Sequence, residues 1–210
     1  MAKRIFDIIA SFLGLIFLSP LLLIIATLIK ILMPGPVFFR QIRTGRHGDH
    51  FLLYKFRTMI CGNGGSTVSI KGESRITPFG AKLRKYKLDE LPELWNVLIG
   101  DMSIVGPRPD MPEYADKLIG NERLILELRP GITCPASLKY CYEEELLAGV
   151  PDPQKFNDEV VWPDKVKMNL DYYFQKSFFG DIIIIIETII RRNKMVKAQT
   201  PVKNKESKRV

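Results

Sequence analysis

An apolar run near the N-terminus, from Ile8 to Ile29, constrains the fold more than any other stretch of this sequence. As a helix rising about 1.5 Å per residue it reaches roughly 33 Å, enough to cross the hydrocarbon core of a bilayer. The run is longer than the hydrophobic part of a secretory signal, and no clear small-x-small cleavage motif follows it. We therefore expect a membrane helix and not a cleaved leader.

Ser19 and Pro20 interrupt this run near its middle. An interior proline removes one helical hydrogen bond and kinks the helix, and the serine hydroxyl can pair with a freed carbonyl. Asp7 lies at the edge of the run, and the segments on both sides are basic: Lys3, Arg4, Lys30, Arg40, Arg43 and Arg46. The positive-inside rule then places both ends on the cytoplasmic face. A re-entrant helix–break–helix, with Asp7 kept wet at its edge, satisfies these features. A straight span with a tolerated kink is equally compatible with the residues alone.

The remaining composition restricts the class of partner. A net charge of +8 and a pI near 9.4 predict an anionic one, such as membrane lipid, a phosphorylated substrate or nucleic acid. Nucleic acid is not expected, because no zinc-finger, RRM or KH motif is present. The cysteines, Cys61, Cys134 and Cys141, are odd in number and lack CxxC spacing, so we interpret them as reduced thiols.

Residues 36–59 predict a β-hairpin, with turn residues between two strand-forming segments. Lys55 and Arg57 then fall on one face and could grip a phosphate; the alternative is a basic edge strand protected from aggregation. Residues 61–69 predict a flexible loop, and residues 78–87 a short basic helix that brings Arg84 near the next segment.

Residues 88–110 begin with two adjacent carboxylates, Asp89 and Glu90, followed by Pro92. The spacing of Leu88, Leu91, Leu94, Trp95 and Leu98 predicts one apolar face of a helix, with Pro92 in its first turn. The carboxylates then lie at a helix N-terminus, where an ordinary structural cap is the alternative to a functional site.

Two arginines are candidate phosphate ligands. Arg108 is held between two prolines, and Arg129 opens the sequence RPGIT. The alternative for both is structural pairing with a carboxylate, namely Asp101, Asp110 or Glu127.

The C-terminal part contains aromatic residues and then five isoleucines, Ile182 to Ile186, in a segment from 171 to 193. The apolar run is too short to span a bilayer. A helix lying at the membrane interface and an ordinary buried core helix both explain it. Residues 194–210 are polar and basic, which predicts a disordered tail.

Several blocks of this sequence, in this order, resemble the bacterial sugar transferases, that is, the monotopic polyprenyl-phosphate phosphoglycosyl transferases. The blocks are KRIFDIIASFLGLIFLSPLLLIIATLIK, GPVFFRQIRTGRHGDHFLLYKFRTM, LDELPELWNVLIGDMSIVGPRP, RPGIT and, more loosely, LDYYFQKSFFGDIIIIIETI. Together they span about residues 3–190.

The resemblance implies a membrane enzyme that moves a sugar 1-phosphate from a UDP-sugar to polyprenyl (undecaprenyl) phosphate and releases UMP, the first membrane step of surface glycan assembly. It implies Mg²⁺, held by Asp89 and Glu90, with Asp89 as the nucleophile and Glu90 as its partner. It also implies that the apolar N-terminus is re-entrant and broken at Ser19-Pro20, in one leaflet of the bacterial inner membrane, with the catalytic domain in the cytoplasm. The basic positions that match substrate-binding positions of the family are Lys55, Arg84, Arg108 and Arg129, to which the hairpin adds Arg57.

The sequence departs from the family pattern after RPGIT, where Cys134 to Tyr140 replace the usual Gly-Trp-Ala-Gln and an acidic stretch follows. This leaves the donor open between an N-acetylated or diamino hexose and a UDP-hexose such as galactose or glucose. A non-catalytic membrane adaptor is the alternative from another class, and a homo-oligomer is one option for its assembly.

We accordingly expect an α+β, mostly helical protein. The expected parts are a re-entrant membrane helix over residues 1–33, a small cytosolic catalytic domain with a β-hairpin and interfacial amphipathic helices over 34–193, and a tail over 194–210.

Overall fold

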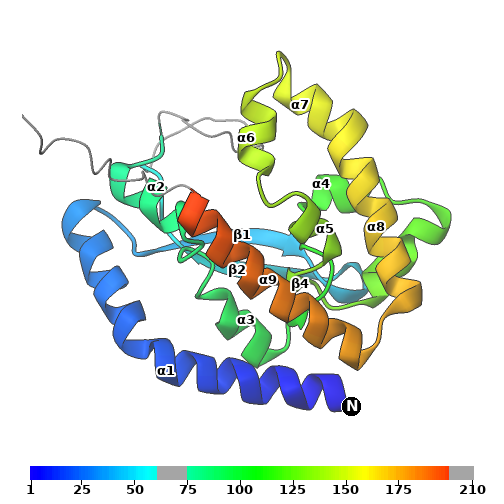
Figure 1. The fold of residues 1–210 in the computed structure, drawn as a ribbon, viewed down its shortest axis with the longest axis horizontal. Helices are drawn as coiled ribbons and strands as arrows, with labels where there is room; N and C mark the ends of the chain where they lie inside the picture. Colours follow the sequence, from blue (N-terminus) through cyan, green and yellow to red (C-terminus); the bar gives the residue numbers. More distant parts are fainter. Residues whose placement is uncertain (61–74, 199–210) are drawn as a thin grey trace, which may run out of the picture.

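A computed structural model describes residues 1–60 and 75–198, and shows a mostly helical protein with a short antiparallel hairpin (Figure 1). The helices are α1 (Ala2–Leu32), α2 (Pro78–Lys85), α3 (Glu93–Ile99), α4 (Pro112–Ala115), α5 (Pro135–Lys139), α6 (Glu143–Ala148), α7 (Pro153–Phe156), α8 (Trp162–Gln175) and α9 (Phe178–Ala198). Shorter helical turns cover Arg46–Gly48, Gly120–Glu127 and Asn157–Val161.

The strands form two small sheets. β1 (Phe38–Thr44) pairs antiparallel with β2 (His50–Phe56), as the sequence predicts, and β3 (Ser103–Val105) pairs in parallel with β4 (Gly131–Thr133). The predicted loop over residues 61–69 lies outside the described residues. The predicted tail begins too early, because α9 continues to Ala198; residues 199–210 lie outside the described part.

Helix α1 is continuous through Pro20 and changes direction between its two halves (Figure 1). Pro20 has no N–H to offer the carbonyl of Ile16, and the hydroxyl of Ser19 donates to that oxygen instead, at 2.7 Å. The predicted serine–carbonyl pair is therefore confirmed. The predicted break is wrong in detail, because the structure has one bent helix where two separate helices were expected.

The first half of α1 is fixed to the domain by two charged residues. The Asp7 carboxylate is buried and accepts from the Ser103 hydroxyl at 2.8 Å and from the Ile104 amide at 3.1 Å. Arg4 donates to the carbonyls of Val97 and Leu98 at the end of α3. The expectation that Asp7 stays in contact with water is wrong, because Asp7 is buried. Two donors from the β3 segment compensate for the burial of its charge.

The second half of α1 returns to the same domain. Ile25, Ile29 and Met33 pack into a cluster with Phe56 at the end of β2 and Leu83 in α2. Both halves of α1 therefore contact elements of one domain, α3 and β3 at the beginning and β2 and α2 at the end.

Replacing Asp7 with alanine should destabilise this attachment. The Ser103 hydroxyl and Ile104 amide would lose their acceptor inside the protein, which costs about 2–3 kcal/mol and lowers the Tm by roughly 4–12 °C for a chain of this size. Thermal unfolding of the detergent-purified chain measures the shift. Asp49→Ala, at an exposed turn, is the control. An equal Tm for the two variants would contradict the anchoring role.

The outward face of α1 is apolar and exposed, and its most apolar stretch is only 11% buried. That degree of burial does not fit the core helix of a soluble domain. Among the described residues, α1 is the one helix long and apolar enough to cross a membrane.

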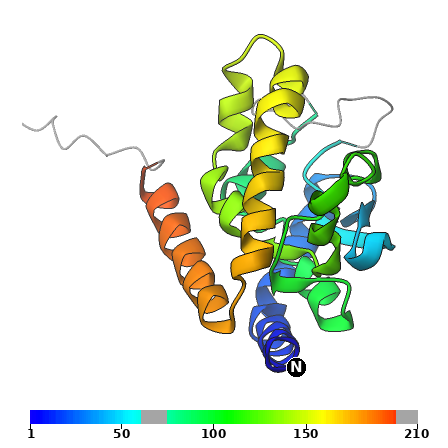
Figure 2. The same cartoon turned by 90° about the vertical axis from the view of Figure 1, so that its right-hand side faces the viewer.

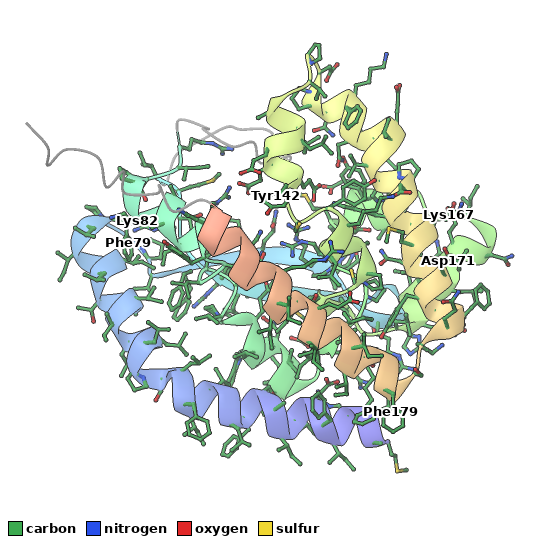
Figure 3. The ribbon with its side chains drawn as sticks, in the orientation of Figure 1. Phe79, Lys82, Tyr142, Lys167, Asp171 and Phe179 are labelled. Atoms are coloured by element: carbon green, nitrogen blue, oxygen red, sulfur yellow. The ribbon has the colours of Figure 1, made fainter. Side chains whose placement is uncertain are left out.

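Helix α9 is likewise not a buried core helix. None of its five consecutive isoleucines is fully buried, and Ile183 and Ile186 are 57% and 50% exposed. Phe178 packs edge-on against Phe6, with ring centroids 5.7 Å apart, and Figure 3 shows Phe179 beside the first turns of α1. The exposed apolar side chains of α1 and α9 thus meet at one edge of the molecule, which favours the interfacial interpretation of α9.

Candidate active site

The two adjacent carboxylates lie in a turn that leads into α3. Leu88 is tied back to α2 by a bond from its amide to the Leu83 carbonyl, and the Phe56 amide at the end of β2 donates to the Asp89 carbonyl at 2.9 Å. Pro92 is the residue before the first helical position, Glu93. The prediction that Asp89 and Glu90 lie near a helix start is confirmed, with α3 beginning after Pro92 and not before it.

The orientation of α3 differs from the predicted apolar face. Its buried side chains are Glu93, Asn96 and Val97, whereas Trp95 is 48% exposed and Leu94 lies toward Gly14 of α1. The spacing of the leucines did not identify the buried face of α3. One side of α3 packs against α1, and the other presents the Glu93 carboxylate to the site.

Glu90 joins the two cations that border the site. Its Oε1 accepts from Arg108 at 2.7 Å and from Lys55 at 3.1 Å, so residues from β2, the α3 turn and the loop after β3 converge on one atom. Lys55 also lies 3.1 Å from Oε1 of Glu93, a third carboxylate that the sequence reasoning missed. Its position three residues after Glu90, one helical turn on, was the available signal.

The pKa values of the two adjacent carboxylates are shifted in opposite directions. Burial, and next the charge of Glu90, raise the pKa of Asp89. Burial also acts to raise the pKa of Glu90, but Arg108 and Lys55 together hold it well below its usual range. Burial raises the pKa of Glu93, and the charge of Glu90 raises the pKa of Arg108. Neighbouring carboxylates with divergent pKa values are typical of a pair with divided chemical roles.

Asp89 has a buried carboxylate oxygen with no partner. Its side chain is 8% exposed, and Oδ1 accepts no hydrogen bond within the described structure. Lys55, Lys87 and Arg84 are near enough for their charges to lower its pKa against the effect of burial. A buried carboxylate oxygen without a donor is costly, and beside three cations it is a candidate for direct contact with a ligand.

A metal site built from protein groups alone is absent from the described residues, which contain no cluster of three potential ligands. Mg²⁺ is commonly held by one or two carboxylates together with substrate phosphates. The unpartnered Oδ1 of Asp89 fits that arrangement. Oε1 of Glu90 is already occupied by Lys55 and Arg108.

The position of Arg108 is fixed by the close approach of two glycines, Gly106 and Gly131. The Gly131 amide donates to the Pro107 carbonyl at 2.8 Å, and the Gly106 amide donates to that of Thr133 at 3.0 Å. A Cβ on Gly131 would lie 2.1 Å from the Gly106 nitrogen, so the strands can approach this closely only with glycine there. Arg108 is therefore held just after the rigid end of β3. It pairs with Glu90 and not with Asp101, Asp110 or Glu127, the carboxylates considered for it from the sequence.

Of the other predicted basic residues, Arg84 lies at the site and Arg57 does not. Arg84 bonds to the Thr58 hydroxyl at 3.1 Å and to Glu144 at 2.9 Å, on the side of the site that borders α6. Arg57 is not beside Lys55, because β2 ends at Phe56 and the guanidinium donates to the carbonyls of Met33 and Pro34 at the end of α1. The predicted phosphate-gripping face of Lys55 and Arg57 is therefore not formed.

Arg129 lies away from the carboxylates of the site. Its Nε donates to the Gly100 carbonyl at 2.9 Å, and it forms no ion pair with Asp101, Asp110 or Glu127 among the described residues. Sequence position alone did not show this, because the partner of Arg129 is a backbone carbonyl from a distant segment.

The segment that departs from the family pattern borders the site. Residues 135–139 form α5, and the acidic stretch begins α6, where Glu144 pairs with Arg84 and Glu143 pairs with Lys165 at 2.7 Å. Figure 3 shows Tyr142 at the start of α6. Acidic side chains thus lie next to the basic residues of the site.

Comparison with known proteins gives a consistent result. The family model described as bacterial sugar transferase matches residues 1–194. A UDP-N-acetylgalactosamine-undecaprenyl-phosphate N-acetylgalactosaminephosphotransferase of Aeromonas hydrophila is 35% identical over 89% of this chain and 42% of its own length. UDP-glucose:undecaprenyl-phosphate glucose-1-phosphate transferases of Xanthomonas campestris pv. campestris and Caulobacter vibrioides are 38% and 34% identical, over 90% and 89% of this chain and 38% and 68% of their own lengths. The chain thus spans about two fifths of the length of the first two relatives.

Proposed function

Because the chain belongs to the bacterial sugar transferase family, we propose that it transfers a sugar 1-phosphate from a UDP-sugar to polyprenyl phosphate and releases UMP. The relatives' names supply the reaction class. The observation that carries the proposal is the buried, unpartnered Oδ1 of Asp89 beside a Glu90 carboxylate held by Arg108 and Lys55. In this role the chain begins surface glycan assembly at the membrane.

Asp89 is the nucleophile in this proposal. Its carboxylate oxygen attacks the sugar-bearing phosphorus of the UDP-sugar, the bond from that phosphorus to the bridging oxygen breaks, and UMP leaves with the oxygen. The product is an acyl phosphate that joins Asp89 to the sugar phosphate. An oxygen of polyprenyl phosphate then attacks the same phosphorus, which forms the diphosphate and returns Asp89 to its carboxylate. No electrons are gained or lost overall.

The surrounding cations offset the charge of this reaction. Arg108 and Lys55 lie on the Glu90 side of Asp89, and Arg84 and Lys87 are also within electrostatic range of it. A negatively charged nucleophile and a diphosphate substrate repel one another, so cations fixed in place before the substrate arrives lower the barrier. Glu90 keeps Arg108 and Lys55 in position through its shared Oε1. Bound Mg²⁺, with Asp89 Oδ1 as its protein ligand, would supply further neutralisation of the phosphates.

Helix α1 is re-entrant in this proposal, with both of its ends at the cytoplasmic face of the inner membrane. The support is that Arg4 and Asp7 contact α3 and β3, whereas Ile29 and Met33 contact β2 and α2 of the same domain. A straight span would carry the two ends to opposite sides of the bilayer and separate one of them from that domain. The bend at Pro20 is where the helix would turn within the leaflet.

Single cysteines at positions 2 and 36 test this topology. We expect a membrane-impermeant maleimide to label Ala2→Cys and Pro36→Cys from the same side of intact inverted vesicles, in a background where the native cysteines are replaced by alanine. Both positions lie at the exposed ends of the α1 region. Labelling of the two variants from opposite sides would contradict the re-entrant arrangement and favour a straight span.

UMP release tests the proposed reaction. The full chain is incubated with polyprenyl phosphate, Mg²⁺ and a panel of UDP-sugars that includes glucose, galactose, N-acetylated hexoses and a diamino hexose. We expect release with at least one donor, and loss of that release when EDTA removes the divalent ions. The relatives differ in their named donor, so the panel identifies the sugar. Release with no donor would reject the reaction and leave a non-catalytic membrane adaptor.

A further inference from the structure

A second basic cavity lies away from the carboxylates of the active site. It has a volume of about 350 Å³ and lies between the first turns of α1, the start of α9 and residues 127–129. Figures 1 and 2 both show the first turns of α1 and α9 side by side at the lower edge of the molecule. Neither Asp89 nor Glu90 lines the cavity, and the cations that hold Glu90 are also absent from its lining.

Two arginines of this cavity are fixed in the same way. Nε of Arg46 donates to the Glu127 carbonyl at 2.7 Å, and Nε of Arg129 donates to the Gly100 carbonyl at 2.9 Å. The terminal nitrogens of both guanidinium groups have no hydrogen-bond partner among residues 1–60 and 75–198. Each arginine is thus held by its inner nitrogen and keeps the pair of outer donors that matches a phosphate group.

Basic side chains outnumber acidic ones in the lining of the cavity. Its lining contains five basic side chains, Lys3, Arg4, Arg46, Arg129 and Lys176, against three acidic ones. Within the part of the chain that the structure describes, none of the three carboxylates forms an ion pair with Arg46 or Arg129: Asp7 accepts from Ser103 and Ile104, Asp181 accepts from Tyr172 and pairs with Lys3 of the same lining, and Glu127 accepts from Tyr173. Burial and then the charges of Arg4 and Arg46 lower the pKa of Arg129, against the opposing charge of Asp7, as expected where neighbouring cations outnumber carboxylates.

We propose that this cavity binds the phosphate group of an anionic membrane lipid. The paired outer donors of Arg46 and Arg129 give the phosphate chemistry, which a free phosphate anion would share. A lipid is favoured because exposed apolar side chains border the cavity, with Met1 and Phe178 in its lining and Phe179 in contact with Phe178. Acyl chains would lie along those side chains while the phosphate occupies the basic cavity.

Calorimetric titration of the detergent-purified full chain tests the proposal without any turnover. The probe is dihexanoyl phosphatidylglycerol below its micelle concentration, and inorganic phosphate is titrated in parallel. We expect one saturable lipid site, and at least a roughly tenfold weaker affinity in the R46Q/R129Q double variant, because charge-assisted hydrogen bonds to two arginines are lost. Since no UDP-sugar is present, the result is independent of the proposed transferase reaction.

The control variant is R40Q/K117Q, which removes the same charge from two exposed positions outside the cavity. It should bind the lipid as the wild type does. R46K/R129K keeps the charge but removes the planar donors, so we expect its affinity for the lipid to lie between those of the wild type and R46Q/R129Q. It also serves as the test variant if R46Q/R129Q fails to fold. Unchanged affinity in both cavity variants, or an equal loss in the control, would overturn the site. Inorganic phosphate that binds as tightly as the lipid would overturn the lipid and leave a free anion as the ligand.

Discussion

Asp89→Asn is expected to abolish UMP release, by a factor of at least about 10⁴, while the protein remains folded. An amide oxygen cannot serve as the nucleophile that takes the sugar phosphate, so the covalent step is lost and not merely slowed. The substitution keeps the shape of the side chain and removes a buried carboxylate that lies beside Glu90. The Tm should therefore be unchanged or higher. Initial rates of UMP release with the active donor, and thermal unfolding, measure the two effects.

The matched control is Asp171→Asn, an exposed acid that Figure 3 shows on α8, at the opposite side of the view from α2. It should release UMP at the wild-type rate. Near-normal release by Asp89→Asn would remove Asp89 as the nucleophile. A folded Asp89→Asn protein without activity, beside an active control, would leave the assignment standing.

Arg108→Ala is expected to lower the rate of UMP release roughly 10²- to 10³-fold, the usual effect of removing a fixed charge that faces a reacting phosphate. Glu90 would lose the partner that bonds to it at 2.7 Å, and Lys55 and the more weakly acting Lys87 would remain to offset its charge. The pKa of Glu90 should then rise toward its ordinary range. Steady-state kinetics should show the loss in kcat/KM.

Lys167→Ala, an exposed cation on α8, is the matched control and should retain full activity. Arg108→Lys separates charge from geometry: it should recover part of the rate, because a lysine supplies the charge but not the planar pair of donors. Full activity in Arg108→Ala would show that Arg108 has only a structural role, as the partner of Glu90. The sequence offered a structural role as the alternative, but with Asp101, Asp110 or Glu127 as the partner.

Local sequence patterns predicted the features that depend on neighbouring residues. The hairpin over 36–59 follows from strand-forming segments on either side of turn residues, and β1 and β2 pair there. The Ser19 hydroxyl bond follows from the proline next to it, since the carbonyl that Pro20 leaves free is within reach of that hydroxyl. The position of Asp89 and Glu90 near a helix start follows from Pro92 in the same way.

Features that depend on distant segments were not predicted. Asp7 and Arg57 bond to backbone groups 97 and 23 residues away in the sequence, and backbone donors and acceptors leave no sequence signature. Arg129 and Arg46 are fixed to carbonyls in the same manner. Residue type alone therefore identified cations able to bind phosphate, but not which of them lie at the active site.

Intact mass spectrometry of the protein incubated with the UDP-sugar panel and Mg²⁺, in the absence of acceptor, tests the central claim most directly. With at least one donor we predict a mass increase of one sugar phosphate, located in the peptide that contains Asp89, absent from Asp89→Asn and removed when polyprenyl phosphate is added. The claim would be contradicted if the unmodified mass persisted with a donor from which the same preparation releases UMP once acceptor is present.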